Sequence, residues 1–184
     1  PPAALWRSRF TMRHSSEPLI SESVLQNRIK ELAAEISRDY ANRNLVLAVV
    51  LKGALMFAAD LSRKLTIPAS IEFVRARSYQ GTRSSRRVRV TVFPEESLAG
   101  KHVLIIEDIL DTGYTTHFLL DRFRDAKPDS LELCTLLDKP ARRNIAVDAK
   151  YVGFTIDDRF VVGYGLDYEE KFRELPAVYV LEET

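Results

Sequence analysis

The sequence is poor in features that define several large classes of protein. It contains a single cysteine, Cys134, so no disulfide can form within the chain, which fits a reducing cytosol. The formal net charge is only +1, which gives no overall field to attract nucleic acid or an anionic membrane. The longest apolar stretch, 45–59, is interrupted by Lys52-Gly53 and is too short to span a bilayer. We therefore expect a cytoplasmic protein with no membrane partner.

The amino-terminal residues do not have the pattern expected of a secretory signal. Residues 1–11 include arginines but no apolar core and no small-residue cleavage pattern, so they do not resemble a secretory signal. Met12 would be a natural start. We expect residues 1–11 to be an extension outside the domain, and an artificial origin is one explanation for them.

The remaining composition is that of one globular domain. The chain has 184 residues, of which 46% are hydrophobic and 29% are charged, and it shows no internal repeat or low-complexity tract. Cys134 lies inside the apolar run 131–137. A buried structural thiol is expected there, in preference to a nucleophile or a metal ligand.

Strand and helix patterns alternate along most of the chain. Ser23 and Gln26 form a capping box at the start of an amphipathic helix that reaches about Tyr40. Helical spacing recurs before Pro68 and again before Pro128, which should end those helices. Apolar runs typical of strands occupy 45–51, 71–78, 88–93, 103–107, 131–137, 151–156, 160–163 and 178–181.

This alternation predicts an α/β protein whose parallel-sheet core is flanked by helices. We expect one domain over 12–184 with its core at about 40–140. The terminal segments 12–39 and 141–184 should form a smaller accessory layer, called here the hood.

The most informative segment is 103–116, which reads VLIIEDILDTGYTT. Residues 103–106 lack the polar alternation of a half-exposed strand, so both faces should be covered, as in a parallel sheet whose strands end at a ligand site. Glu107, Asp108 and Asp111 follow, and their mutual repulsion is relieved if a cation or sugar hydroxyls lie between them. The hydroxyls and amides of 112–116 suit a phosphate at the start of a helix.

The run from Glu107 to Thr116 resembles the phosphoribosyl-pyrophosphate-binding motif of type I phosphoribosyltransferases: two acidic residues, two apolar residues, then Asp-Thr-Gly-x-Thr. Three further segments resemble the 6-oxopurine branch of that family. They are LKGA at 51–54, DKP at 138–140, and FVVGYGLDY at 160–168 followed by Phe172-Arg173. From about Ile20 to its end, the chain is similar to hypoxanthine and hypoxanthine-guanine phosphoribosyltransferases.

The resemblance implies the type I phosphoribosyltransferase fold and a role in purine salvage. The reaction it implies is Mg2+-dependent transfer of the 5-phosphoribosyl group from 5-phosphoribosyl 1-pyrophosphate to N9 of hypoxanthine or guanine. The products would be IMP or GMP and pyrophosphate. The substrates are thus small molecules, nucleic acid is not expected as a partner, and homodimers or homotetramers are usual in the family.

The resemblance places the phosphoribosyl donor on the 107–116 motif. Glu107 and Asp108 would accept the ribose hydroxyls and, with Asp167, are candidate Mg2+ ligands. From the residues alone, a solvated acidic strand end and simple N-capping by Thr112 or Thr115 are the alternatives. The candidate phosphoribosyl and phosphate-binding residues of the turn are Asp111, Thr112, Gly113, Tyr114, Thr115 and Thr116.

The same resemblance places the purine on a second set of residues. Asp111 is the candidate general base, facing N7 of the purine. Lys139 would donate to the 6-oxo oxygen, which would exclude a 6-amino purine; an exposed loop lysine is the alternative. Phe160 would stack on the base and the Val161 backbone would meet its edge, with Asp167 nearby, although an aromatic residue in an apolar run is more often core.

Pyrophosphate would bind at the loop after the first long strand. The resemblance implies a non-proline cis peptide in the loop that holds Lys52-Gly53. It also implies a pyrophosphate contact from Arg173, for which a surface arginine is the alternative. Ser78-Tyr79, continuing to residue 87, resembles a mobile lid. Six arginines and no acidic residue lie in 75–89, which would suit pyrophosphate, RNA or simple solvation.

Two other functions use the same residues. A regulator with this fold could bind RNA or DNA and use the nucleotide only as an effector, and the arginine-rich segment 75–89 gives that hypothesis some support. A xanthine-preferring or pyrimidine enzyme of the same fold is a third possibility. The set of Lys139, Phe160 and Asp167 favours the purine enzyme over the regulator.

Overall fold

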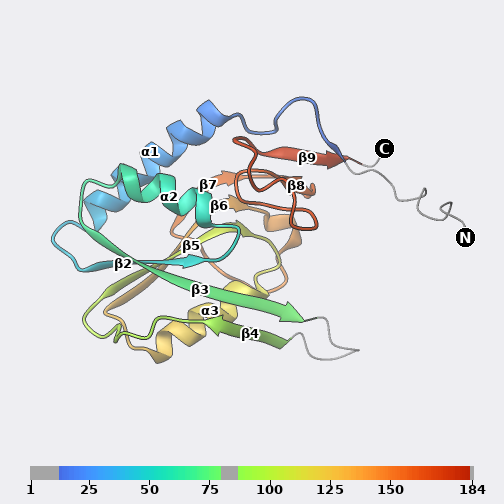
Figure 1. The fold of residues 1–184 in the computed structure, drawn as a ribbon. Coiled ribbons are helices and arrows are strands. Elements are labelled where there is room, and N and C mark those ends of the chain that lie inside the picture. Colours follow the sequence, from blue (N-terminus) through green and yellow to red (C-terminus); the bar gives the residue numbers. More distant parts are fainter. Residues whose placement is uncertain (1–12, 80–86, 183–184) are drawn as a thin grey trace, which may run out of the picture.

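The computed structural model describes residues 13–79 and 87–182, which form two sheets with helices on both faces of the larger one (Figure 1). The larger sheet has six strands in the order β4-β3-β2-β5-β6-β7. All its neighbouring strands are parallel except β3 and β4. The smaller sheet has the order β1-β9-β8 and is antiparallel. The predicted α/β parallel-sheet core is confirmed.

The bounds of the elements follow the predicted order along the chain. The helices are α1 (Glu22–Asp39), α2 (Leu55–Lys64) and α3 (Tyr114–Asp125), with a short 3-10 turn, η1 (Pro140–Arg142). The strands are β1 (Arg13–His14), β2 (Leu45–Val50), β3 (Ala69–Tyr79), β4 (Arg87–Val92), β5 (His102–Leu110), β6 (Ser130–Asp138), β7 (Tyr151–Thr155), β8 (Val161–Val162) and β9 (Tyr179–Glu182).

The large sheet is covered on both faces, which explains why its central strands are apolar throughout. Every residue of β2 is buried, and successive side chains enter two different cores. Leu47 packs in the same core as Ile29 of α1 and Phe57 of α2. Ala48 packs in the opposite core with Phe123 of α3. The sheet therefore holds the carboxyl ends of its strands at a fixed edge between two helical layers.

Two local predictions need correction. The side chain of Ser21, not Ser23, accepts the hydrogen bond from the Val24 amide, so the predicted capping box is wrong and the helix begins at Glu22. Strand β5 also continues past the predicted end at Glu107, because its ladder with β6 extends as far as the pair Leu110 and Asp138. The acidic pair after Ile106 is therefore part of the strand.

The division between core and hood differs from the expected one. α1 packs against α2, and β7 pairs with β6, so both belong to the large sheet and its helical layer although their residues fall in 12–39 and 141–184. The separate layer consists of β1, β8 and β9. The reason is that the apolar face of α1 needs a broad apolar surface, which the short hood strands do not provide.

Four further predictions concern the cysteine, a membrane span, the amino-terminal extension and the lid. Cys134 is buried in β6, as predicted. Within residues 13–79 and 87–182, no helix is both long enough and apolar enough to cross a membrane. The extension expected at 1–11 and most of the expected lid, residues 80–86, lie outside the described residues.

Candidate active site

Two pockets adjoin at the edge of the large sheet where β2, β5 and β6 end. The β5 pocket has a volume of about 210 Å3 and the β6 pocket about 320 Å3. They share Asp108, Ile109 and Asp111. The other polar or glycine residues of the β5 pocket are Gly53, Glu107, Thr112, Gly113, Thr115 and Thr116. Those of the β6 pocket are Lys139, Arg142, Asp158 and Asp167, beside the apolar Phe160, Val161 and Leu166.

The turn from β5 into α3 forms one wall of the β5 pocket. Gly113 has φ +88°, and a Cβ there would lie 2.6 Å from the carbonyl oxygen of Ile145, so only glycine fits. α3 has no side-chain N-cap, so the alternative that Thr112 or Thr115 simply caps the helix is wrong. Both threonines line the pocket, where the amides of the first helical turn also lie.

In the acidic pair of β5, Glu107 is buried and Asp108 is partly buried. Glu107 is 6% exposed, and its Oε2 atom has no hydrogen-bond partner within the described part of the chain. Burial, reinforced by the charge of Asp108, raises the pKa of Glu107 well above its ordinary value. Burial also raises the pKa of Asp108 to about 6. These carboxyls are not a solvated strand end, and a bound cation or hydrogen-bond donor would stabilise their ionised forms.

Close backbone packing brings the loop after β2 against the acidic pair. The peptide bond between Leu51 and Lys52 is cis, as the resemblance implied for this loop. A Cβ on Gly53 would lie 1.7 Å from Asp108 Oδ2, so the glycine is required for this approach. A Cβ on Gly165 would in turn lie 2.0 Å from the carbonyl oxygen of Gly53. The 51–54 loop is therefore held between Asp108 and the turn at Gly165.

A network of charged side chains joins the same loop to the hood. Lys52 Nζ lies 2.7 Å from Glu170 Oε2, and Arg173 Nη2 lies 3.5 Å from the same oxygen. Arg173 Nη2 also lies 2.7 Å from Asp167 Oδ1, and its Nη1 donates to the Gly165 carbonyl at 2.6 Å. Neither Lys52 nor Arg173 is among the described residues that line the two pockets. Both lie at the rim, with Glu170 as their shared carboxylate.

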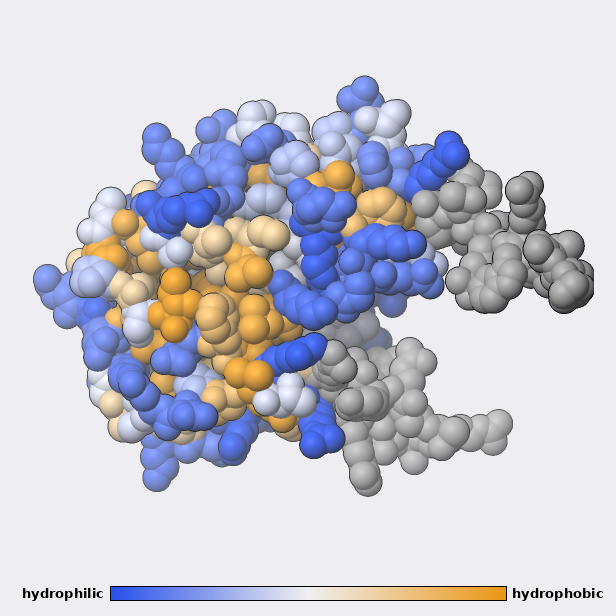
Figure 2. Space-filling model, in the orientation of Figure 1, coloured by the Kyte–Doolittle hydropathy of each residue, from blue (hydrophilic) through white to orange (hydrophobic). Residues whose placement is uncertain are grey.

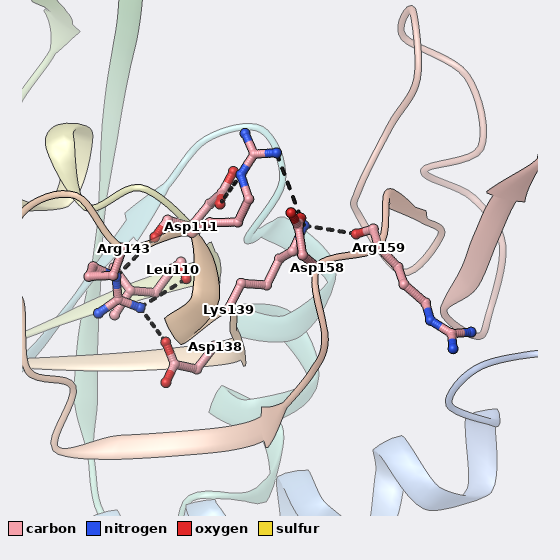
Figure 3. Close-up of polar contacts among 8 residues, drawn as sticks. Leu110, Asp111, Asp138, Lys139, Arg143, Asp158 and Arg159 are labelled. Carbon is pink, nitrogen blue, oxygen red and sulfur yellow. Dashed lines mark hydrogen bonds and ion pairs between the residues drawn. The ribbon is translucent and has the colours of Figure 1, made fainter.

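Lys139 is an integral part of the β6 pocket. Its residue is 6% exposed, so the alternative of an exposed loop lysine is wrong. Its Nζ donates to the carbonyl oxygen of Arg159 at 2.8 Å and lies 3.3 Å from Asp158 Oδ1. Figure 3 shows the Lys139 side chain directed at these two acceptors. Lys139 lines the β6 pocket, so its ammonium group is a hydrogen-bond donor available there.

The aromatic and apolar wall of this pocket comes from the start of β8. Phe160 is 56% exposed, so the expectation that it could be a core residue is wrong. Its ring meets the edge of Tyr168 with centroids 5.9 Å apart. Val161 is buried and pairs with Val180 of β9. An exposed ring over a pocket provides an apolar face for a planar ligand.

Two arginines that the sequence did not mark as site residues lie three and four positions after Lys139. Arg143 donates to the backbone carbonyls of Asp111 at 2.9 Å and Leu110 at 3.1 Å, and it contacts the Asp138 carboxylate (Figure 3). It thus fixes the backbone that carries Asp111. Arg142 lines the pocket, with its Nε 3.3 Å from Asp111 Oδ1. The signal available in the sequence was the basic pair itself, two positions after Pro140 at the end of a buried strand.

The three candidate metal ligands do not form one preformed cage. Within the described residues, no group of three or more His, Cys, Asp or Glu side chains is placed to hold a metal ion. Asp167 nevertheless lies close enough to raise the pKa of Asp108, although burial is the larger cause. The unpartnered Oε2 of Glu107 adds an oxygen that needs a partner. This set fits Mg2+ held by one or two carboxylates together with ligand oxygens and water.

The expected lid begins at the end of the β3–β4 ribbon. Ser78 pairs with Val88 and Tyr79 with Arg87 in an antiparallel ladder. The loop that joins these strands lies in residues 80–86, outside the described part of the chain. Ala76, nearby on β3, lines the β5 pocket. Ser78 and Tyr79 lie two and three residues further along β3, and their role stays a prediction.

Comparison with known proteins gives a consistent result. The family model for the phosphoribosyl transferase domain matches residues 21–169. Hypoxanthine phosphoribosyltransferase of Haemophilus influenzae is 45% identical over 177 residues, covering 93% of this chain and 99% of that protein.

Solved structures agree with this result in their fold. A hypoxanthine-guanine phosphoribosyltransferase of Bacillus anthracis superposes with a TM-score of 0.86 at 43% identity, covering 93% of this chain and 99% of that one. A hypoxanthine phosphoribosyl transferase of Trypanosoma cruzi, whose C-terminal region was studied for its role in oligomeric state and activity, has a TM-score of 0.87 at 39% identity. The superposition covers 92% of this chain and 93% of the Trypanosoma cruzi chain.

Proposed function

The chain belongs to the phosphoribosyltransferase family, and we propose that it transfers the 5-phosphoribosyl group of 5-phosphoribosyl 1-pyrophosphate to N9 of hypoxanthine or guanine in purine salvage. The observation that carries the proposal is the junction of the two pockets at Asp108 and Asp111. One pocket offers groups for a sugar phosphate and the other offers groups for a 6-oxopurine. The bond between sugar and base would form where they meet.

The β5 pocket is proposed to hold the donor. The transition state develops positive charge on the ribose and negative charge on the departing pyrophosphate, so the site must stabilise both. Thr112, Thr115, Thr116 and the neighbouring amides would hold the 5-phosphate, to which the start of α3 is also favourable. Glu107 and Asp108 would accept the ribose hydroxyls, which relieves the repulsion between the two neighbouring carboxyls.

The β6 pocket is proposed to hold the acceptor base. Lys139 would donate to the 6-oxo oxygen, a contact that a 6-amino group cannot accept in the same way. Phe160 would stack on the ring, and Val161 would meet its edge through the backbone. Asp111, at the junction, would take or share the N7 proton, which makes N9 a better nucleophile.

Pyrophosphate is proposed to leave at the rim between the 51–54 loop and the hood. It would be bound by Lys52, the Gly53 amide and Arg173. Pyrophosphate would then replace the Glu170 carboxylate, which pairs with both Lys52 and Arg173 in the structure. Asp167, with Asp108 and Glu107 as further oxygens, would hold Mg2+, which when bound neutralises charge on the pyrophosphate oxygens. Ser78 and Tyr79 are proposed to begin a lid that excludes water during the transfer.

The apolar surface suggests that the protein associates with itself. Ile71 and Phe73 of β3 and Leu55 of α2 are each more than 40% exposed. Figure 2 shows apolar side chains gathered over the face where β3 and α2 lie in Figure 1. Such a patch is usually covered by a partner, and we propose a homodimer or homotetramer in the cytoplasm. The double substitution Ile71→Glu and Phe73→Glu should lower the sedimenting mass, whereas Phe118→Glu on α3 should not.

The function is tested by mixing the protein with Mg2+, phosphoribosyl pyrophosphate and one base at a time, and measuring nucleotide by chromatography. Hypoxanthine or guanine should give IMP or GMP with one pyrophosphate released per nucleotide, and adenine should give none. Product from xanthine or a pyrimidine alone would assign a different substrate. No product from any base, with tight binding of RNA, would support the regulator hypothesis instead.

A further inference from the structure

The side chain of Arg142 lies between the two groups assigned to the purine. Its Nε is 3.3 Å from Asp111 Oδ1 and its Nη1 is 3.6 Å from Asp158 Oδ1. The same Asp158 oxygen is 3.3 Å from Lys139 Nζ. Asp111, Arg142, Asp158 and Lys139 therefore form a row of alternating charges, called here the charge chain, across the β6 pocket.

Arg142 is the group that compensates the charge of Asp111. Among residues 13–79 and 87–182, no other cation lies within 4.0 Å of the Asp111 carboxylate. Asp111 Oδ1 is shielded from solvent and accepts no hydrogen bond in the described part of the chain. A carboxylate oxygen in that position is oriented by its nearest charge, and that charge is the Arg142 guanidinium.

The guanidinium suits this place better than an ammonium would. Its planar fork carries several N–H groups at fixed angles, so a single side chain can contact two carboxylates at once. Arg142 does so with Asp111 and Asp158, while it remains 48% exposed at the mouth of the pocket. The neighbouring Arg143 has a different role, because its donors are spent on backbone carbonyls and on Asp138.

We propose that Arg142 is a positioning residue for the transfer reaction. It holds the Asp111 carboxylate toward N7 of the purine and, through Asp158, holds the Lys139 ammonium toward the 6-oxo oxygen. This inference rests on the function proposed above. It follows that Arg142 acts on the acceptor and on bond formation, while the donor in the β5 pocket binds without its help.

The first test compares Arg142→Gln with Arg142→Lys in single-turnover measurements of IMP formation. The Gln variant should form IMP about tenfold more slowly, because a catalytic group that is only misplaced loses part of its effect. Its KM for phosphoribosyl pyrophosphate should stay within about twofold of the original value. The Lys variant should recover part of the rate, because it keeps the positive charge but can contact only one of the two carboxylates. Arg124→Gln, which breaks an exposed pair with Asp121 on α3, is the matched control and should change neither value.

The second test asks whether Arg142 acts through Asp111. In an Asp111→Asn background, Arg142→Gln should slow the reaction by less than about twofold further, because the group it orients is already gone. The inference would be overturned if the rate losses of Arg142→Gln and Asp111→Asn simply multiplied in the double variant. It would also be overturned if the rate loss of Arg142→Gln matched a lower fraction of folded protein, measured by thermal unfolding. An unmodified protein that makes no nucleotide refutes the proposed function itself. An active protein whose Arg142→Gln variant is equally fast refutes only the positioning role.

Discussion

The two pockets that meet at Asp111 are built in different ways. The β5 pocket comes largely from one continuous segment, 107–116, together with the loop that holds Gly53. Its acids, Glu107 and Asp108, lie close together with raised pKa values, caused first by burial. The β6 pocket instead collects side chains from separate segments, and its charges already pair with one another.

This difference teaches how each pocket prepares for its ligand. The β5 pocket keeps carboxyls with raised pKa values, so ribose hydroxyls or Mg2+ would improve their electrostatic environment on binding. The β6 pocket keeps its donors and acceptors oriented in advance, so a neutral purine has to disturb few charges. Backbone packing at Gly53 and Gly113 fixes the first pocket, and the charge chain fixes the second. The predictions below perturb the shared wall, then each pocket separately.

The largest effect is expected at Asp111, on the shared wall. Asp111→Asn should lower kcat by about 10² to 10³-fold, because loss of a general base usually costs that much. The KM for phosphoribosyl pyrophosphate should change only a few fold. Steady-state kinetics with hypoxanthine gives both values. Equal turnover in the variant would remove Asp111 from the base role, and a loss confined to KM would make it a binding residue only.

The next largest effect should come from Gly53, which belongs to the β5 pocket alone. A Cβ there would lie 1.7 Å from Asp108 Oδ2, so Gly53→Ala must displace the loop or the carboxylate. Displacement of that size should lower kcat/KM for phosphoribosyl pyrophosphate by about 10²-fold. Gly100→Ala is the control for backbone strain away from the site, because φ is +75° there, a Cβ meets nothing within 4 Å and Gly100 lines neither pocket. If both variants lose the same activity, close packing at Gly53 is not what shapes the donor site.

A smaller effect, confined to the β6 pocket, is expected at Lys139. Lys139→Gln should lower kcat/KM for hypoxanthine by about 10- to 100-fold, the usual loss for a hydrogen bond from a charged donor. The preference for hypoxanthine over adenine should narrow, since the amide can also accept. Lys101→Gln, which breaks a pair with the exposed Glu96, serves as the control. If Lys139→Gln kept the parent's preference for hypoxanthine over adenine, backbone groups and not the Lys139 side chain would select the base.

The smallest effect concerns stability and would sharpen the contrast between the pockets. Burial raises the pKa of Asp108 from 3.8 to about 6, so folding favours its protonated form. This contribution to stability is complete below pH 3.8 and is lost as the pH rises through about 6. Asp108→Asn, which cannot ionise, should therefore be more stable than the parent at pH 7.

The stability comparison is made by urea unfolding of the ligand-free protein in a chelator. The difference between Asp108→Asn and the parent should shrink as the pH is lowered from 7 to 4, because the parent carboxyl is then protonated as well. The variant should also bind phosphoribosyl pyrophosphate more weakly. A variant that is less stable than the parent at pH 7 would contradict the view that the ionised carboxyl is unfavourable without ligand.

The sequence predicted the β5 pocket better than the β6 pocket. The acids, the hydroxyl-rich turn and Gly113 lie within ten residues, so local spacing is enough to bring them together. The same spacing could not say which hydroxyls cap a helix, and the structure shows that Thr112 and Thr115 do not. It also placed the helix start at Ser23, because two serines two residues apart offer similar caps.

Arg142 and Asp158 show what the sequence left out. They are 16 residues apart in the chain, yet both reach the β6 pocket and one another. Gly53 is a second case, because the sequence suggested only that glycine eases an unusual peptide bond. The structure adds a reason, the approach of Asp108 from β5 and of Gly165 from the hood. Each of these contacts joins segments that the fold brings together.

By itself, the sequence determined the α/β class, the order of nearly all strands and helices, and a donor motif that is local in the chain. Hydrophobic periodicity and turn chemistry act over a few residues, so they can be recognised without the fold. Only the tertiary structure decided that α1 and β7 join the core, that Lys139 is buried, and that Arg142 stands between Asp111 and Asp158. The reason is that burial and ion pairing depend on the distance between segments remote in sequence, which sheet order and helix packing set.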